Sequence, residues 1–489
     1  MYQKIYPEPK KVVCRNGFFE FGNELTLKIS KDFAREESLP MMAELFTNFT
    51  CGVCKLNIEK THGEGSFLWT LGSHSEIEIG DEYTYAVSVE ESGVAIKGKD
   101  DLSLIHGFYT MLQMIDIDNL DEGNEKFSIG CGRIDDAPDL KYRFAYININ
   151  IGDSFDVLRK QIRFIAMMKF SHIAFEYPGS LKYDYMPELS WENAFTKEQI
   201  KPIINEARSL GLEVMPQFNS LGHASMGTLM NCKHIFLDRN PKLALMFEPM
   251  GSSFCLSNEE TLKLLDAVQE EVIELSGPGS FFHMGLDEAL DFATCKKCAD
   301  KDKAEFLAKY VNDTAAKMRK KGRRTMVWGD MLFARKQFDP ELDYRKPGKE
   351  FHVANATDEM YTHKALEKID RDVIICDWQY YITQGTLETS KYAASLGFDV
   401  IPASWNNFKN MQFLASEAGK HNYMGYMSAA WEAQGPNADL LLYSADVAWN
   451  AKTAKDIDSF RLEERFYAVG NLSRKLYPIA ATEETAGWQ

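Results

Sequence analysis

The stretch Phe281-Phe282-His283-Met284-Gly285-Leu286-Asp287-Glu288 joins an apolar pair, typical of a buried strand, to two neighbouring carboxylates. Side chains alternate across a strand, so both acids can face one site only where the strand ends and the chain bends. In parallel α/β folds, functional groups gather at this C-terminal end of the strands. The acids could instead open the following helix, where carboxylates stabilise the helix dipole. The stretch therefore predicts a catalytic acid pair or a helix start.

A regular alternation of strand-like and helix-like segments surrounds this stretch. The apolar runs are Phe144–Ile151, His172–Tyr177, Glu213–Phe218, Phe281–Gly285, Thr325–Trp328, Val373–Cys376, Asp399–Ala403 and Tyr423–Ala429. The helical patterns between them include Lys197–Ser209, Glu259–Leu275, Lys303–Lys321, Glu359–Ile369 and Met411–His421. Such alternation means parallel pairing, and eight strands close a barrel. The fold class is α/β, and the sequence predicts a (β/α)8 TIM barrel.

A small α+β domain is expected before the barrel, because residues 1–135 mix strand and helix patterns without this rhythm. Tyr85–Lys97 alternates like a hairpin, and Asp101–Ile117 carries an apolar stripe at helical spacing. The barrel is expected over residues 136–452. Residues 453–489 look partly helical and are expected to form a C-terminal helical tail.

The net charge of the chain limits the classes of partner that it can bind. Among 489 residues, 55 Lys and Arg stand against 72 Asp and Glu, and the net charge is −17. This field repels nucleic acid and anionic membranes, so neither partner is expected. The basic run Lys317–Arg324 is better explained as a helix end that stops at Gly322. No segment approaches the ~20 apolar residues of a membrane-spanning helix, and the N-terminus lacks the apolar region of a signal peptide.

Nine cysteines, an odd number in a large chain, favour free thiols in a reducing compartment, and a cytoplasmic location is expected. Two Cys-x-x-Cys pairs occur, Cys51/Cys54 and Cys295/Cys298. A zinc site needs four ligands, and these pairs lie far apart along the chain. A local metal or redox link at Cys295/Cys298 stays open. A lone pair is a weak signal, so neither a metal nor a cofactor is predicted.

The residues that follow the eight predicted strands should converge on one pocket. They are rich in groups that bind sugars, namely acids, amides and aromatic rings. The candidates are Arg143, Glu176, His223, His283, Asp287, Glu288, Trp328, Asp330, Trp378, Tyr380, Trp405, Trp431 and Glu432. Four of the eight tryptophans fall at strand ends. Any one of them is more often a packing residue. Together they favour a surface on which the C–H face of a sugar can stack.

Several motifs resemble glycoside hydrolase family 20, the β-N-acetylhexosaminidases. His283–Glu288 is similar to the signature His-x-Gly-Gly-Asp-Glu of that family. Val214-Met215-Pro216 with Gly222-His223 resembles the family's third strand, and Met326–Asp330 resembles its fifth. Asp136–Arg143 resembles the entry to the first strand. The resemblance runs from about residue 135 to 450. The stretches Ala174–Tyr177, Phe254–Ser257 and Trp328–Met331 resemble the hexosaminidase D-like branch in particular, whose members are often cytosolic.

The resemblance implies a retaining, substrate-assisted mechanism on terminal GalNAc or GlcNAc of an oligosaccharide or glycoconjugate. The 2-acetamido oxygen of the sugar attacks the anomeric carbon and forms an oxazolinium ion. Glu288 would be the general acid and base, and Asp287 would orient the acetamido group. Arg143 would hold sugar hydroxyls, and Trp431 would form the pocket floor. His223 and His283 would brace the acids or serve as structural histidines. The resemblance predicts neither which of the two sugars is preferred nor the oligomeric state.

The chain departs from the family pattern at several positions. Leu286 replaces the second signature glycine, and Gln217 and Asn219 replace the third-strand acids. The usual seventh-strand Tyr-x-Asp is missing, and Tyr380 is a candidate to supply the hydroxyl. A barrel glycosidase with Asp287 or Glu176 as covalent nucleophile stays open as an alternative. So does a non-catalytic barrel that only binds glycans.

Overall fold

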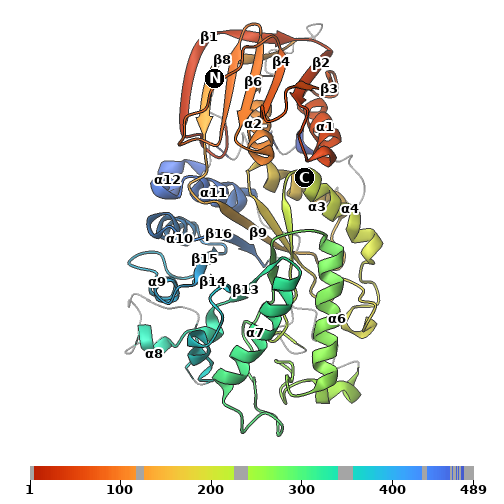
Figure 1. Ribbon diagram of the computed structural model, residues 1–489, viewed down its shortest axis with the longest axis vertical. Helices are drawn as coiled ribbons and strands as arrows, with labels where there is room; N and C mark the ends of the chain where they lie inside the picture. The colour runs from red at the N-terminus through yellow and green to blue at the C-terminus, as the bar shows by residue number, and fades with distance from the viewer. Residues whose placement is uncertain are drawn as a thin grey trace.

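The computed structural model describes residues 5–116, 126–224, 240–339, 356–358, 360–431, 438–462, 465, 470, 472 and 475–477. Within these residues the chain forms two β-sheets, each with helices packed against it (Figure 1). The second sheet is the barrel that carries the acid pair.

Eight parallel strands form the barrel, and all eight predicted runs are confirmed. The strands are β9 (Tyr142–Asn148), β10 (His172–Glu176), β11 (Glu213–Pro216), β12 (Phe281–His283), β13 (Arg324–Trp328), β14 (Ile374–Asp377), β15 (Asp399–Ser404) and β16 (Gly425–Ala430). Their order is β11-β10-β9-β16-β15-β14-β13-β12. A parallel bridge between Gln217 and His283 closes the ring. Every strand C-terminus therefore points to one mouth.

Helices follow the strands around the outside of the barrel (Figure 1). They are α3 (Phe155–Met167), α4 (Lys197–Ser209), α6 (Glu259–Ser276), α7 (Lys303–Lys320), α9 (Glu388–Ser395), α10 (Phe408–His421) and α11 (Ala438–Trp449). Shorter turns are η2 (Pro187–Leu189), η4 (Pro241–Met246), η5 (Asp330–Leu332), α8 (Arg335–Phe338), η6 (Thr362–Glu367), η7 (Ala451–Thr453) and α12 (Ile457–Phe460).

Local signals set several helix ends. Thr196 and Gln199 form a capping box at the start of α4. Helix α7 ends in basic residues, and Gly322 follows with φ +72°, so the predicted helix end is confirmed. The expected helix at 359–369 is instead the short 3-10 turn η6. Its first flanking residue, Tyr361, has φ +55°, which stops an α-helix from extending toward the N-terminus. Glu359 lies outside the described residues.

The first sheet has the order β1-β8-β5-β6-β4-β2-β3, with β7 beside β8. Its strands are β1 (Lys11–Phe21), β2 (Glu24–Ser30), β3 (Lys55–His62), β4 (Leu68–Gly72), β5 (Tyr85–Glu90), β6 (Gly93–Gly98), β7 (Ile115–Asp116) and β8 (Phe127–Asp136). The predicted hairpin is β5–β6. The other elements are η1 (Glu36–Ser38), α1 (Leu39–Phe49) and α2 (Asp101–Met114). Helix α2 confirms most of the predicted helix, although Ile115 pairs with β8.

The two parts of the chain meet at the N-terminal end of the barrel strands, away from the mouth. Helix α2 lies between the first sheet and the barrel (Figure 1). The Tyr109 hydroxyl donates to the Leu210 carbonyl, and Trp449 Nε1 donates to Asp136. The domain boundaries near residues 135 and 452 stay a prediction.

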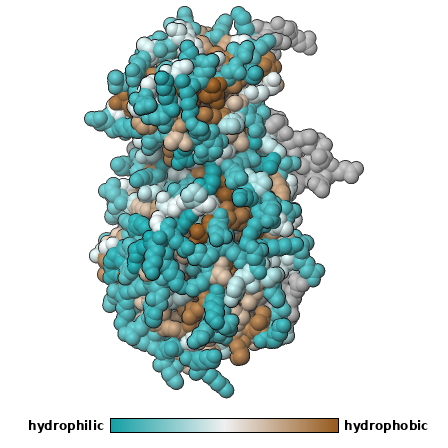
Figure 2. Space-filling view, turned by 45° about the vertical axis from the view of Figure 1, so that its right-hand side comes forward, coloured by the Kyte–Doolittle hydropathy of each residue, from teal (hydrophilic) through white to brown (hydrophobic). Residues whose placement is uncertain are grey.

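The surface in Figure 2 is mainly hydrophilic, with smaller groups of hydrophobic residues. Inside the barrel, inward side chains stack into a separate core. They are Phe144, Tyr146, Ala174, Met215, Phe281, Met326, Trp328, Ile374, Cys376, Ile401, Ala403, Met427 and Ala429. Among the described residues, no helix combines the length and apolar character needed to cross a bilayer.

Candidate active site

The acid pair sits on a sharp turn directly after β12. Gly285, Leu286 and Glu288 all have positive φ, of +71°, +99° and +48°. A Cβ at Gly285 would lie 2.5 Å from the side-chain Cγ of Asn219, so only glycine fits there. Positive φ is costly for residues other than glycine and is concentrated at functional sites. The turn therefore uses local strain to place both acids at the barrel mouth.

His223 bridges the two acids. Its Nε2 lies 3.2 Å from Asp287 Oδ2 and 3.2 Å from Glu288 Oε2. The loop that carries His223 approaches the acid turn closely, because a Cβ on Gly222 would lie 1.7 Å from the Asp287 carbonyl oxygen. His223 therefore binds the acids and is not an isolated pocket residue.

Two further polar side chains hold the acid turn. Asn219 Nδ2 donates to Asp287 Oδ1 at 2.6 Å, while its Oδ1 accepts from the Leu286 backbone N–H. The Glu288 backbone N–H donates to Asp330 Oδ2 at 3.0 Å. Trp378 Nε1 donates to the other oxygen of Asp330 at 3.1 Å. The Asp287 side chain and the Glu288 backbone are thus each held by a residue that follows a neighbouring strand.

Two carboxylates that lie side by side repel each other, and this repulsion alone would raise the pKa of one of them. A hydrogen bond from His223 holds the pKa of Glu288 below its usual range, so crowding does not raise it. Burial lowers the pKa of His223, but the two carboxylates outweigh it and raise the value to about 10. Burial, with the nearby Asp287, raises the pKa of Asp330 to about 7. The imidazolium therefore offsets the mutual repulsion of the pair.

Four aromatic side chains follow the ends of β14, β15 and β16 at the same mouth of the barrel. Trp431 Nε1 donates to the Tyr380 hydroxyl at 2.8 Å. The Tyr380 ring centroid lies 5.1 Å from that of Trp378 and 5.7 Å from that of Trp405. Trp378, Trp405 and Trp431 are each partly exposed. This aromatic wall, which comprises Trp378, Tyr380, Trp405 and Trp431, offers ring faces to a ligand.

Other predicted residues lie beneath this layer. Trp328 is 1% exposed and packs on Tyr146, His283 and Trp431, so the prediction that it faces substrate is wrong. His283 is fully buried, and burial lowers its pKa to about 3, so it is a neutral histidine. Its Nδ1 accepts from the Gly285 N–H at 3.1 Å. His283 therefore braces the acid turn and does not touch a sugar.

Arg143 lies at the opposite end of the barrel, and its predicted role in binding sugar is wrong. It is 2% exposed near the start of β9. Its guanidinium donates to the carbonyls of Leu140, Lys141 and Lys169 and stacks 4.8 Å from the Trp449 ring centroid. The side chain alternation that points Phe144 inward turns Arg143 outward, toward the first domain.

Glu176 lies at the mouth and accepts from the Tyr146 hydroxyl at 2.7 Å. Glu432 falls outside the described residues. Sequence reasoning did not assign roles to Asn219 and Tyr146. Tyr146 could have been found from strand alternation, because it shares the inward face of β9 with Phe144.

A pH titration can test the His223 bridge. A raised pKa means that the stability from His223 is fully present below its ordinary value of 6.5 and is lost as pH rises toward 10. The wild-type melting temperature should therefore fall between pH 7 and 10 relative to that of His223→Gln. The variant should also melt lower at pH 7, because two carboxylates lose their shared cation. Parallel curves for the two proteins over that range would disprove the bridge.

Comparisons with known proteins identify the family of the chain. Residues 172–444 match glycosyl hydrolase family 20, catalytic domain, and residues 2–137 match domain 2 of the same family. The catalytic match covers more than half of the chain. The chain belongs to glycosyl hydrolase family 20. Family 20 membership confirms the resemblance inferred from the sequence motifs and the α/β barrel fold.

Curated relatives are distant and longer. A β-hexosaminidase of Porphyromonas gingivalis is 21% identical over 67% of this chain and 45% of its own length. A lacto-N-biosidase of Bifidobacterium bifidum is 22% identical over 70% of this chain and 32% of its own. The chain thus spans less than half the length of these two relatives.

Solved structures show the same fold over nearly the whole chain. A β-N-acetylhexosaminidase from Bacteroides fragilis has a TM-score of 0.69 at 16% identity, covering 99% of both chains. An exo β-N-acetylglucosaminidase of family 20 from Vibrio harveyi, in complex with N-acetylglucosamine, has a TM-score of 0.68 at 16% identity. It covers 98% of this chain and 79% of that one.

Proposed function

We propose that this family 20 protein is an exo-acting β-N-acetylhexosaminidase that releases terminal GalNAc or GlcNAc by a retaining, substrate-assisted mechanism. The observation that carries the proposal is the pair Asp287 and Glu288, bridged by His223 at the barrel mouth beside the aromatic wall. One acid can protonate a leaving oxygen while the other stabilises the positive charge that develops on the sugar. The relatives named for hexosaminidase activity support the same chemistry.

Glu288 is the proposed general acid and base. Its side chain is 50% exposed, whereas that of Asp287 is 12% exposed, so Glu288 is the acid that a leaving group can reach. In the free protein its carboxylate is stabilised by His223. A bound aglycone would remove water from Glu288 and raise its pKa, because desolvation disfavours the charged form. Glu288 would then take up a proton from solvent, donate it to the glycosidic oxygen and later take a proton from the attacking water.

Asp287 is the proposed partner of the acetamido group. Asn219 and His223 fix its two oxygens. A carboxylate held in this way can accept the acetamido N–H and stabilise the positive charge that forms as the acetamido oxygen attacks the anomeric carbon. Tyr380 accepts from Trp431 and so can donate its own proton to that acetamido oxygen.

A panel of aryl glycosides tests the substrate class. The β-N-acetyl-galactosaminide and -glucosaminide should turn over at least ~100-fold faster than the matched galactoside and glucoside, because only the former carry the internal nucleophile. A thiazoline that mimics the oxazolinium ion should inhibit competitively. Equal rates with and without the acetamido group, together with a trapped glycosyl-enzyme, would instead favour the covalent alternative. Binding without turnover of any glycoside would favour a glycan-binding barrel.

We further propose that the protein works in a reducing compartment such as the cytoplasm. Eight cysteines fall in the described residues, and none of them is paired in a disulfide. Extracellular domains normally pair such residues. Thiol-specific labelling in intact cells should find these cysteines in the reduced state. Disulfide-linked peptides recovered from the native protein would contradict this location.

A further inference from the structure

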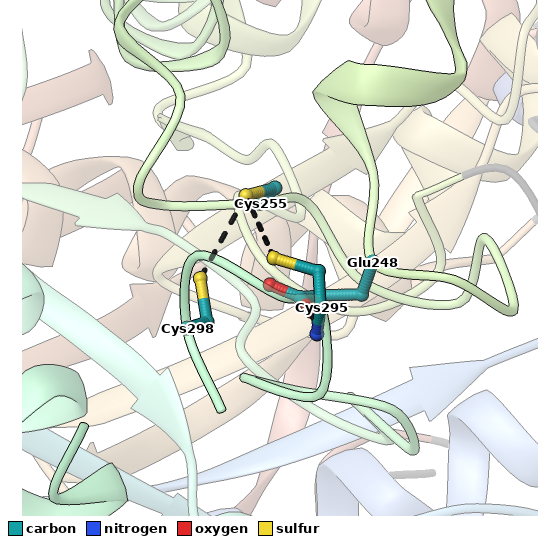
Figure 3. A group of neighbouring side chains, drawn as sticks. All are labelled: Glu248, Cys255, Cys295 and Cys298. Atoms are coloured by element: carbon teal, nitrogen blue, oxygen red, sulfur yellow. Dashed lines mark hydrogen bonds between the residues drawn. The ribbon is translucent and has the colours of Figure 1, made fainter. Parts of the chain in front are cut away.

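Four potential metal ligands converge from two loops beside the acid turn. Glu248 and Cys255 come from the segment between η4 and α6, and Cys295 and Cys298 come from the loop between β12 and α7. Cys255 Sγ lies 3.6 Å from Cys295 Sγ and 3.7 Å from Cys298 Sγ. All four ligand atoms lie within 4.8 Å of one another, and the three sulfur atoms point toward a common centre (Figure 3).

These separations suit a shared cation better than a disulfide. A disulfide needs an S–S distance of about 2.05 Å, and three thiols cannot all pair. Zinc–thiolate bonds of about 2.3 Å at tetrahedral angles place two sulfurs about 3.8 Å apart. The two separations from Cys255 Sγ, 3.6 and 3.7 Å, are close to that value.

The environment of Glu248 also favours a bound cation. Glu248 is 1% exposed. One of its oxygens, Oε2, accepts from the backbone N–H groups of Thr294 and Cys295. The other, Oε1, is buried and has no hydrogen-bond partner among the described residues. A buried carboxylate oxygen without a partner is costly, and a bound cation would satisfy it.

We propose that Glu248, Cys255, Cys295 and Cys298 bind one Zn²⁺ in a closed tetrahedral site. Three thiolates and one carboxylate fill all four positions, as in structural rather than catalytic zinc sites. Soft thiolates select zinc over magnesium or calcium, and an iron–sulfur cluster would normally take a fourth cysteine. On binding, the three thiols release their protons to solvent and the Glu248 carboxylate coordinates without redox change. The Ser257 hydroxyl, 3.1 Å from Cys298 Sγ, can donate to the thiolate.

The zinc site would hold the loops that position the acid pair. Between two of the ligands, the Met250 N–H donates to Asp291 at 2.7 Å, and Ser252 Oγ donates to the Glu288 carbonyl at 3.3 Å. The Ser252 carbonyl also accepts from the Ala224 N–H, next to His223. One cation would thus anchor the segment that contacts both the acid turn and the His223 loop.

Metal analysis of the full chain tests this proposal independently of any sugar chemistry. After growth with added zinc and purification under reducing conditions, we expect one zinc per chain. Cobalt added to protein stripped of zinc should give the intense thiolate-to-metal absorption and visible bands of tetrahedral Co²⁺. Cys295→Ser should lower zinc affinity by at least ~100-fold, since loss of outer-shell partners alone costs 10–100-fold. Glu248→Gln, which keeps all three thiols, should lower it by at least ~10-fold.

Cys51→Ser is the matched control, because Cys51 belongs to the other Cys-x-x-Cys pair and is exposed. This variant should keep its zinc. Wild-type protein that is folded but holds no zinc and gives no cobalt spectrum would overturn the proposal. So would a disulfide between Cys255 and either Cys295 or Cys298 in the purified protein. A loss of zinc from Cys51→Ser as large as that from Cys295→Ser would overturn it too. If Cys295→Ser does not fold, the wild-type metal content and Glu248→Gln still decide the question. Zinc without hexosaminidase turnover would leave this site standing and refute only the proposed function.

Discussion

Replacing Glu288 by Gln should lower kcat/KM for an aryl N-acetylhexosaminide with a poor leaving group by at least ~100-fold, because the variant has no proton to donate. The loss should shrink for an aryl glycoside whose phenol is strongly acidic, since that leaving group needs no protonation. The side chain keeps its size, and the contact between the Glu288 N–H and Asp330 is unchanged. Steady-state kinetics on a series of aryl leaving groups measures both effects.

Glu305→Gln provides the matched control for this variant. It makes the same chemical change on a side chain that is 65% exposed on α7, and its kinetics should equal those of wild type. A loss that is the same for every leaving group would mean that Glu288 shapes the site without transferring a proton. Unchanged turnover of the poor substrate would remove Glu288 from the mechanism.

Replacing Asp287 by Asn should lower kcat on the order of 100- to 1000-fold, the cost of losing one oriented electrostatic group in a transition state. The neutral amide cannot offset the charge of the oxazolinium ion, and it also deprives His223 of one carboxylate partner. Azide should restore little activity, because in the proposed mechanism the nucleophile belongs to the substrate. Rates measured with and without azide, and identification of the sugar product, distinguish the two mechanisms.

Asp313→Asn controls for the charge change, because Asp313 is 56% exposed on α7 and pairs with Lys309 of the same helix. Its kinetics should match those of wild type. Strong azide rescue of the Asp287 variant, with a glycosyl azide as product, would show that Asp287 is a covalent nucleophile. That outcome would overturn the substrate-assisted mechanism and leave the barrel site itself in place.

Much of the fold was predictable from the sequence because the signals are local. Apolar runs such as His172–Tyr177 and amphipathic stretches such as Lys197–Ser209 have the periods of a strand and a helix, and their alternation specifies parallel pairing. The acid pair was predictable for the same reason, since Asp287 and Glu288 are adjacent and follow an apolar run. The aromatic wall was predictable from the positions of tryptophans directly after strands.

Other features of the site depend on contacts between residues far apart in the chain. Asn219 and Asp287 are separated by 68 positions, yet their hydrogen bond orients the acid. The direction of Arg143 follows from which face of β9 it occupies, and the burial of Trp328 follows from layers built by other strands. The pKa values of Glu288 and Asp330 likewise depend on neighbours from other loops.

The sequence by itself determined the α/β barrel, the first domain and the pair of acids at a strand end. Tertiary structure alone decided that His223 joins those acids, that Arg143 faces the first domain, and that Glu248 and Cys255 meet Cys295 and Cys298. The physical reason is the distance along the chain over which each interaction acts. Periodicity and turn chemistry act over a few residues, whereas burial, charge pairing and metal geometry arise only after the folded chain brings distant loops within a few ångströms.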